Sequence, residues 1–302
     1  MSEACRANHR DTQPAGRTGA ADGLVLLADA ADERRFGAKA ANLARALRAG
    51  LPVPDGLVLA SDTARQVGDG ASAALTALVA ATQRWGATIA VRSSAVGEDG
   101  PTASFAGQHV TRLGVRATEG ALRAAITTVA ASATSPHAVA YRHAILGAEG
   151  PGRPSTAFGT TAGVAVLIQP LIHAQVSGVM FTVDPVTGTD DLLIEAVHGL
   201  GEAAVGGQVT PESWQLRRGG VITRGRPGRQ AVAIEPAPGG GTRDRPLTPA
   251  ELAGPCLEPG ALRHLTRLAA DCRALFGKDA LDIEWAWAGR RPWLLQCRPV
   301  TA

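Results

Sequence analysis

The sequence contains few aromatic residues and few cysteines. Aromatic residues make up 4% of the 302 positions. The four cysteines are far apart and show no paired spacing, so they indicate neither a disulfide framework nor a zinc site, and a reducing compartment is expected. They are Cys5, Cys256, Cys272 and Cys297.

Long hydrophobic segments are absent as well. Residues 1–21 lack the apolar core of a secretion signal, and the longest apolar runs, such as residues 164–168, are far too short to span a membrane. We therefore expect a cytoplasmic protein without a membrane partner. Residues 1–22 are polar and are expected to form a disordered tail.

A large net charge is also missing. The formal charge is +3, which is too small to indicate a nucleic-acid partner, so anionic ligands are expected only at local sites. A chain of 302 residues has room for a full hydrophobic core, arranged as one large domain or as two lobes.

The C-terminal run Leu281–Val300 alternates between large apolar residues and other types. This period of two continues on both sides of a turn signal at Gly289–Pro292, which predicts two strands in a hairpin. A hairpin centred on Arg290 has one polar face, formed by the pairs Asp282 with Arg298 and Glu284 with Gln296. Its apolar face consists of the pairs Ile283 with Cys297, Trp285 with Leu295 and Trp287 with Trp293.

The polar face of this hairpin has the chemistry of a phosphate and magnesium site. Side-chain oxygens of Glu284 and Gln296 on adjacent strands suit Mg²⁺, which also holds phosphates. Arg298 beside them is a planar donor for a phosphate oxygen. The alternative is a solvated outer face, but surface strands usually carry Thr, Lys or Ser. Chemistry on a nucleotide is therefore the first hypothesis.

A lysine lies in the first turn of a predicted helix. The helix begins near Ala38, and Gly50 and Pro52 end it. Lys39 is unfavourably placed against the helix dipole, which makes sense if an anion occupies the same helix end. The alternative is that Lys39 extends into water.

Other stretches show further elements. A buried strand runs into Arg92 and two serines, followed by a Gly-containing loop, which suits a phosphate cradle but also fits an ordinary connection. Residues 223–244 are rich in Gly, Pro and Arg and predict a loose surface excursion. Thr248–Glu251 has the form of a helix capping box, and Gly260–Phe276 has the apolar stripe of a helix.

Five motifs in the same order resemble one family. They are Phe36-Gly-Ala-Lys-Ala-Ala-Asn-Leu with Gly50-Leu-Pro-Val-Pro, Val91-Arg-Ser-Ser-Ala with Ala103-Ser-Phe-Ala-Gly-Gln, Ser177-Gly-Val-Met-Phe-Thr with Asp184-Pro, Gly199-Leu-Gly-Glu, and Asp282-Ile-Glu-Trp with Leu295-Gln-Cys-Arg-Pro-Val. Over residues 24–301 the chain resembles the N-terminal ATP-binding domain of phosphoenolpyruvate synthase, pyruvate phosphate dikinase and rifampin phosphotransferase.

The resemblance implies an α+β ATP-grasp fold whose two lobes bind Mg²⁺ and ATP between them. The expected lobes are residues 23–163 and residues 164–302. By position in the motifs, the implied phosphate contacts are Lys39, Arg92 and Arg298, with catalytic roles. Glu284 and Gln296 would hold Mg²⁺. The remaining implied nucleotide contacts are Gly107 and Thr111 at the phosphate loop and Gln169 at the adenine.

The chain departs from the family in two respects. Ala38 and Ala40 stand where the family often has glycine. The whole enzymes also carry a phosphohistidine in a Gly-Gly-x-Thr/Ser-x-His context, followed by an acceptor domain. No such context surrounds any of the seven histidines, which are His9, His109, His137, His143, His173, His198 and His264.

The resemblance therefore implies the ATP-binding, phosphoryl-donating subunit of a split phosphoenolpyruvate synthase-like phosphotransferase, which passes a phosphoryl group from Mg-ATP to a histidine on a separate protein. Alternatives are the ATP-binding half of a rifampin-phosphotransferase-like system that modifies an antibiotic, and a nucleotide-binding regulatory module without catalysis. A ligase of the ATP-grasp class that activates a carboxylate is a further alternative, which no feature of the sequence favours.

Overall fold

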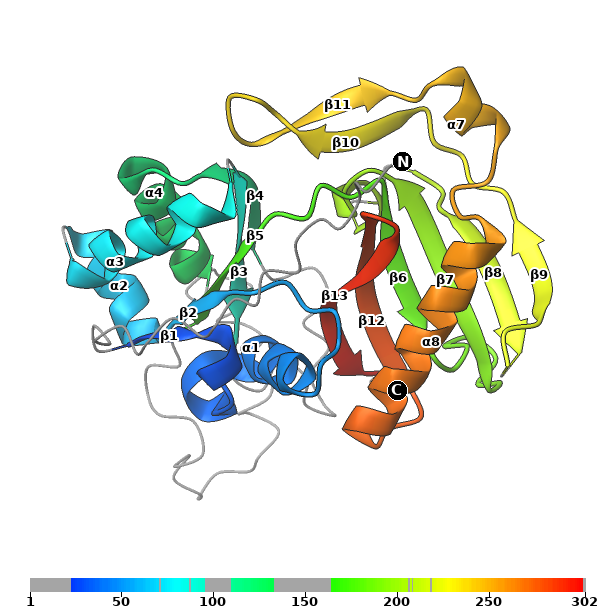
Figure 1. The fold of residues 1–302 in the computed structure, drawn as a ribbon, viewed down its shortest axis with the longest axis horizontal. Helices are drawn as coiled ribbons and strands as arrows, with labels where there is room; N and C mark the ends of the chain where they lie inside the picture. Colours follow the sequence, from blue (N-terminus) through cyan, green and yellow to red (C-terminus); the bar gives the residue numbers. More distant parts are fainter. Residues whose placement is uncertain are drawn as a thin grey trace, which may run out of the picture.

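The structure is a computed structural model that describes residues 23–70, 72–86, 88–95, 110–132, 164–205, 207, 209–217 and 219–300. The predicted tail at residues 1–22 and Gly107 lie outside the described residues. Two β-sheets lie side by side in Figure 1 with helices packed against each, and the chain forms an α+β fold of two lobes as the sequence predicts.

The first sheet has five strands in antiparallel pairs. Their order is β1 (Leu24–Leu26), β2 (Leu57–Leu59), β5 (Ala165–Pro170), β3 (Thr88–Ser94) and β4 (Thr111–Arg116). Apolar residues of this sheet pack against three helices and form one core cluster. The helices are α2 (Ser61–Asp69), α3 (Ala73–Thr82) and α4 (Glu119–Ala131). Helix α1 (Glu33–Arg48) lies on the other face of the sheet, where Leu43 shares a core cluster with Val58 and Leu167. This lobe also contains the short 3-10 helices η1 (Leu27–Asp29) and η2 (Gln83–Trp85).

The second sheet has six antiparallel strands. Their order is β13 (Arg291–Pro299), β12 (Leu281–Ala288), β6 (Val176–Phe181), β7 (Asp191–His198), β8 (Glu212–Arg217) and β9 (Ile222–Arg226). Helix α8 (Pro259–Phe276) covers one face with its predicted apolar stripe, including the buried Leu265 and Cys272. The capping box of Thr248 and Glu251 is confirmed at the start of α7 (Pro249–Ala253).

The division between the sheets differs from the predicted division between the lobes. The sequence analysis places the boundary between residues 163 and 164, but β5 lies between β2 and β3 in the first sheet. The chain passes to the second sheet only between Pro170 and Val176. The reason is hydrogen bonding over long sequence distances, since β5 completes a sheet whose other strands end at Arg116.

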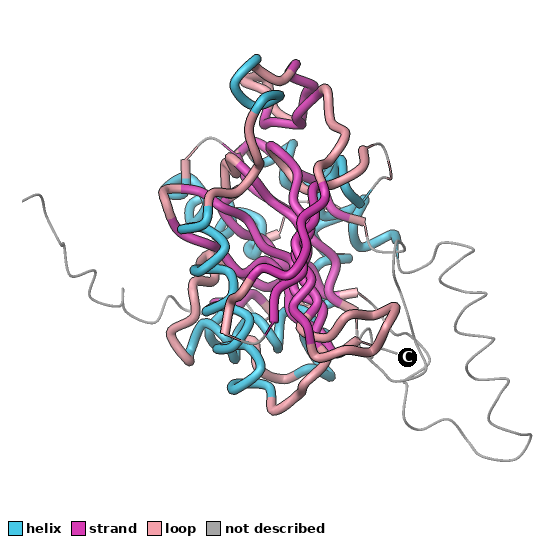
Figure 2. The backbone as a smooth tube through the Cα atoms, turned by 90° about the vertical axis from the view of Figure 1, so that its right-hand side faces the viewer, coloured by secondary structure: helices cyan, strands magenta, loops and turns pink. Residues whose placement is uncertain are grey.

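A two-stranded hairpin connects the two lobes. It consists of β10 (Val232–Pro236) and β11 (Thr242–Pro246), and we call residues 232–246 the strap. The strap leaves the second lobe beside α7 and reaches β4 of the first (Figure 1). Figure 2 shows it projecting from one end of the molecule, above the strands. The predicted loose excursion at residues 223–244 is therefore wrong, because this stretch is largely paired.

Backbone contacts hold both ends of the strap. At its base, the Leu200 N–H donates to the Ile234 carbonyl at 2.8 Å. At its tip, the Gly241 N–H donates to the Gly114 carbonyl of β4, also at 2.8 Å. A side chain at Gly114 would collide with the strap, since an added Cβ would lie 2.0 Å from the Gly241 oxygen. The tip thus rests directly on the backbone of the first lobe.

Within the described ranges, every helix is too short or too polar to cross a lipid bilayer.

Candidate functional site

The hairpin of β12 and β13 presents the predicted polar face. Asp282 pairs with Arg298, and Glu284 pairs with Gln296, which confirms the predicted register for this half. Residues on the opposite face are buried at 0 to 2% exposure and pack in the core with α8. They include Ile283, Trp285, Leu294 and Cys297. Burial of the apolar face therefore fixes which side chains point away from α8.

The other half of the hairpin differs from the prediction. A β-bulge follows Glu284, so Trp285 pairs with Leu294 and not with Leu295, and Trp287 pairs with Pro292 and not with Trp293. The turn is the cause. Only Gly289 and Arg290 form it, with φ of 61° and 62°, as in the tight two-residue turns of hairpins. This turn shifts the register by one residue, and the bulge absorbs the shift.

Arg92 joins the two sheets at this bulge. It lies in β3 and is only 9% exposed. Its Nη2 donates to Glu284 Oε2 at 2.6 Å, and its Nη1 donates to the carbonyl oxygen of Leu295, the extra residue of the bulge. Charge-assisted hydrogen bonds of this kind are about twice as strong as neutral ones. The guanidinium is thus held where the first sheet meets the polar face of the hairpin.

Lys39 lies next to Arg92. Its Nζ donates to the Ser93 carbonyl oxygen at 3.2 Å, and the residue is 4% exposed. It belongs to α1 (Glu33–Arg48), which starts earlier than predicted and is kinked at Gly37, where φ is 78°. The kink lets α1 approach β3 closely, because an added Cβ at Gly37 would lie 2.3 Å from the Ser94 oxygen.

The backbone amides at this kink are already used. The Ala38 N–H donates to the Ala95 carbonyl at 2.9 Å, and the Ala40 N–H donates to Ser94 Oγ at 3.0 Å. Strand β3 therefore satisfies these two amides. The anion at this helix end that the placement of Lys39 suggested stays a prediction. The positive charge at this place comes from the ammonium of Lys39.

Arg298 lies on the same face as Glu284 but has an acidic neighbour. Its Nε and Nη2 both donate to Asp282 Oδ2, at 2.9 and 2.8 Å. Burial raises the pKa of Asp282, while the Arg298 guanidinium opposes that rise. The predicted hairpin register places Asp282 opposite Arg298, and the structure confirms this pairing.

Three other predicted site residues lie in the part of the chain that the structure describes. Thr111 begins β4 and is paired with Arg92 in the sheet. Gln296 is 5% exposed beside Glu284. Gln169 is 3% exposed at the end of β5, and its Nε2 donates to the Pro54 carbonyl at 2.8 Å. The adenine contact expected of Gln169 stays a prediction, as do the individual roles of the other residues.

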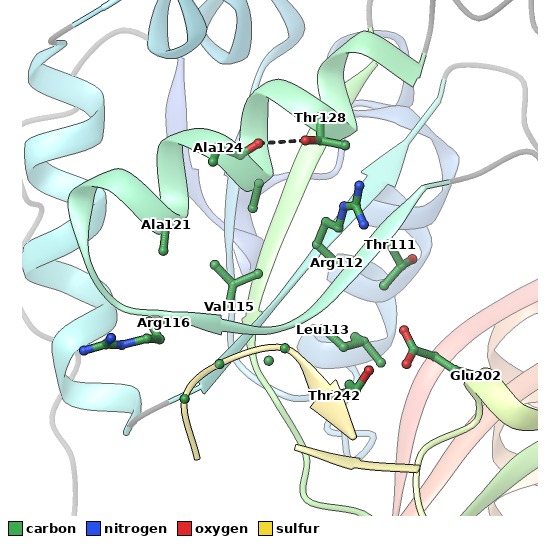
Figure 3. A pocket seen from close by; sticks show the side chains of 15 residues that line it. Thr111, Arg112, Leu113, Val115, Arg116, Ala121, Ala124, Thr128, Glu202 and Thr242 are labelled. Carbon is green, nitrogen blue, oxygen red and sulfur yellow. Dashed lines mark hydrogen bonds between the residues drawn. The ribbon is translucent and has the colours of Figure 1, made fainter. Parts of the chain in front are cut away.

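A cleft of about 470 Å³ runs along the outer edge of β4. Its walls come from β4, α4, the strap tip and α6 (Glu202–Val205) (Figure 3). Thr111 lies at one end of the cleft, and Glu202 points toward β4 from the second lobe. Glu202 closes the Gly199-Leu-Gly-Glu motif, so the sequence marked this residue without indicating a role for it.

Glu195 is a residue that the sequence analysis missed. It is half-buried in β7, and burial raises its pKa. It shares the face of Glu284, because Glu284 pairs with Val179 and Val179 pairs with Glu195. The sequence signal that could have identified Glu195 is the alternation of polar and apolar residues in β7, where its neighbours Ile194 and Ala196 are buried in the core with α8.

The donor set at the hairpin fits a magnesium ion that is shared with a nucleotide. Glu284 contributes a carboxylate and Gln296 an amide oxygen on adjacent strands. No group of three His, Cys, Asp or Glu residues arranged to hold a metal exists among the described residues. Mg²⁺ typically binds through one or two protein oxygens and completes its shell with water and substrate phosphates, so two oxygen donors suffice here.

Comparison with known proteins identifies the family. Residues 69–302 match the family described as pyruvate phosphate dikinase, AMP/ATP-binding domain. The chain belongs to this family. Its members include ATP-dependent phosphotransferases, and the ATP-grasp fold predicted from the resemblance is confirmed by this membership and by the two facing lobes.

Several relatives of this ATP-binding domain are much longer proteins. The prodigiosin synthesizing transferase PigC of Serratia marcescens is 35% identical in an alignment of 298 positions that covers 89% of this chain and 32% of that protein. A rifampicin phosphotransferase of a Streptomyces species is 37% identical, over 70% of this chain and 23% of that protein. A probable phosphoenolpyruvate synthase of Methanocaldococcus jannaschii is 31% identical, over 71% and 17%. The chain thus spans about a third or less of these relatives.

Among solved structures, a D-alanine–D-alanine ligase from Bacillus anthracis complexed with ATP aligns with 86% of this chain and 54% of its own, at 9% identity and a TM-score of 0.36.

Proposed function

We propose that this chain binds Mg-ATP between its two sheets and donates a phosphoryl group to a histidine of a separate polypeptide. The observation that carries the proposal is the bond from Arg92 of the first sheet to Glu284 of the second. It gathers the cations of one lobe and the oxygen ligands of the other at a single place, where a triphosphate and its metal both find partners.

Each residue has a role in this proposal. The Lys39 ammonium and the Arg92 guanidinium bind phosphate oxygens, and Arg298 binds the phosphate chain. Glu284 and Gln296 hold Mg²⁺, which supplies positive charge to the phosphate oxygens when it is bound. Gly107 in the loop and Thr111 in the strand contact the phosphates, and Gln169 contacts the adenine, as the family resemblance implies.

The hydrogen bond between Arg92 and Glu284 is replaced by new partners for both side chains when Mg-ATP binds. An ion pair that loses one partner leaves the other charge uncompensated, and this matters most for Arg92, whose side chain is 10% exposed while that of Glu284 is 34% exposed. Mg-ATP leaves neither charge uncompensated, because its phosphates replace Glu284 as the partner of Arg92, while its metal replaces Arg92 as the partner of Glu284. The nucleotide without metal lacks the second exchange, so binding should depend on Mg²⁺.

The acceptor is proposed to be a histidine on another polypeptide, since none of the histidines in this sequence has the family's phosphohistidine context. That polypeptide would relay the group to pyruvate or to another small molecule. A second candidate is the ATP-binding half of an antibiotic-modifying system. The 37% identity to a protein named rifampicin phosphotransferase favours it, and the two candidates differ only in the final acceptor.

The test uses the full chain, Mg²⁺ and ATP labelled at the β- or γ-phosphate, together with a candidate histidine-bearing polypeptide. We expect acid-labile label on that polypeptide with wild-type protein and none with Glu284→Ala. Glu119→Ala is the control, since Glu119 forms an exposed ion pair with Arg123 on α4 and should transfer normally. Tight ATP binding without transfer to any candidate would favour a regulatory module, and unchanged transfer by Glu284→Ala would contradict the proposed site.

A further inference from the structure

Positive charge is concentrated at the outer edge of the second sheet. Residues 213–234 contain five arginines and no aspartate or glutamate, although the whole chain is nearly balanced with 30 basic and 27 acidic residues. Four of these arginines are described, all of them exposed. They are Arg217, Arg224, Arg226 and Arg229, and we call them the basic edge.

The basic edge has no acidic partner of its own. Within the described ranges, no carboxylate forms an ion pair with any of its four arginines. Asp191 lies opposite Arg217 in the sheet, but its Oδ2 accepts hydrogen bonds from Gln215 and Thr189. On the strap, by contrast, Arg243 is paired with Glu235 at 2.6 Å and Arg245 with Glu251 at 2.8 Å. What distinguishes this edge is that four arginines without an acidic partner among the described residues lie close together in the sequence.

The edge also offers unpaired backbone. Strand β9 is the last strand of its sheet, so among the described residues no further strand pairs with its outer side. All five of its residues are exposed, including Ile222 at 48%, and Val221 before it is 65% exposed. Edge strands with free N–H and C=O groups accept an added strand, and alternate side chains of that strand then decide specificity.

The basic edge shares a face with the proposed phosphate site. One row of paired residues crosses the sheet and consists of Glu284, Val179, Glu195, Ser213 and Arg226. Successive partners in such a row point to the same face. Four strand spacings of roughly 4.8 Å separate Glu284 from Arg226, about 19 Å in all. A small domain is wide enough to cover this distance, since its radius of gyration is about 13 Å for 100 residues.

We propose that the basic edge docks an acidic, extended segment of the phosphoryl-accepting polypeptide, and so places that polypeptide over the face that carries Glu284. This inference rests on the proposed function. Charge complementarity selects an acidic partner, and the exposed apolar residues and open strand edge select a peptide backbone over a nucleic acid. Attraction between exposed charges acts over about 10 Å at 0.1 M salt, so the basic edge also guides the approach.

The test measures binding of a labelled peptide of alternating glutamate and threonine to the full chain by fluorescence polarisation. We expect Arg224→Glu/Arg226→Glu to weaken binding at least tenfold and higher salt to weaken binding to the wild type. The control is Arg65→Glu/Arg263→Glu, which makes the same charge change at exposed arginines of α2 and α8 and should leave the affinity unchanged. Equal loss in both double variants would overturn the proposal, as would tighter binding of a single-stranded oligonucleotide at the same salt.

Mg-ATP binding to the same variants separates this proposal from the proposed function. We expect Arg224→Glu/Arg226→Glu to bind Mg-ATP as the wild type does. Normal peptide docking in a protein that does not bind Mg-ATP would refute the proposed function alone. Normal Mg-ATP binding without selective loss of the peptide in this variant would refute the docking surface alone.

Discussion

The contact between the strap and β4 predicts an unusually large cost for one small substitution. Gly114 has φ of 70°, and Gly188 has φ of 69°, so alanine at either position incurs a similar backbone strain of about 1 to 2 kcal/mol. The surroundings differ. An added Cβ at Gly188 meets nothing within 4 Å, whereas at Gly114 it lies 2.0 Å from the Gly241 oxygen. Gly188→Ala is therefore a matched control for Gly114→Ala.

Steric contact at Gly114 requires the strap tip to move by more than 1 Å before ordinary contact distance is restored. That movement breaks the hydrogen bond from the Gly241 N–H to the Gly114 carbonyl, which contributes about 1 kcal/mol, and leaves the buried carbonyl to find another donor. We expect Gly114→Ala to lower the free energy of unfolding by about 2 kcal/mol more than Gly188→Ala does.

Urea denaturation of the two variants measures this difference, and limited trypsin cleavage after Arg243 in the strap provides a second reading. Cleavage should be faster in Gly114→Ala than in Gly188→Ala. Equal stability and equal cleavage in the two variants would show that the strap does not rest on β4, and the reasoning from the Gly114 contact would fail.

Three further predictions concern single side chains. Arg92→Lys keeps the charge but cannot reach Glu284 and the Leu295 carbonyl together, so the Kd for Mg-ATP, measured by calorimetry, should rise about tenfold. Hydrogen bonds from Arg245 and then from the Thr248 backbone lower the pKa of Glu251 from 4.5 to about 2, so its stabilisation is complete above pH 4.5 and is lost as the pH falls toward 2. Glu251→Gln should cost about 1 kcal/mol at pH 7 in urea unfolding, and the difference should shrink at pH 3; a constant difference would contradict this. Burial, with Glu212 nearby, raises the pKa of Cys256 to about 12, so the thiol should react with iodoacetamide at pH 8 far more slowly than free cysteine, as mass spectrometry can check.

The sequence predicted the polar face of the hairpin because strand alternation depends only on local pattern. The pairs of Asp282 with Arg298 and Glu284 with Gln296 follow from it. The bulge does not, because the length of the turn decides whether an extra residue is needed. Gly289 and Arg290 form a two-residue turn where a longer one was expected. The Leu295 carbonyl that accepts from Arg92 depends on that difference.

Contacts between distant segments account for the remaining differences. The kink at Gly37 is explained by the close approach of Ser94, which is distant in the sequence. Strand β5 belongs to the first sheet because it pairs with both β2 and β3. The strap appeared to be a loose segment because Gly and Pro are frequent in it, yet those glycines permit close backbone contact with β4. Composition alone does not distinguish these two uses of glycine.

A crystal structure of the full chain with Mg²⁺ and a non-hydrolysable ATP analogue tests the central claim most directly. We predict phosphate oxygens within hydrogen-bond distance of Lys39 Nζ and the Arg92 guanidinium, with the metal on the side-chain oxygens of Glu284 and Gln296. A nucleotide bound elsewhere, with Arg92 still paired to Glu284, would contradict the account.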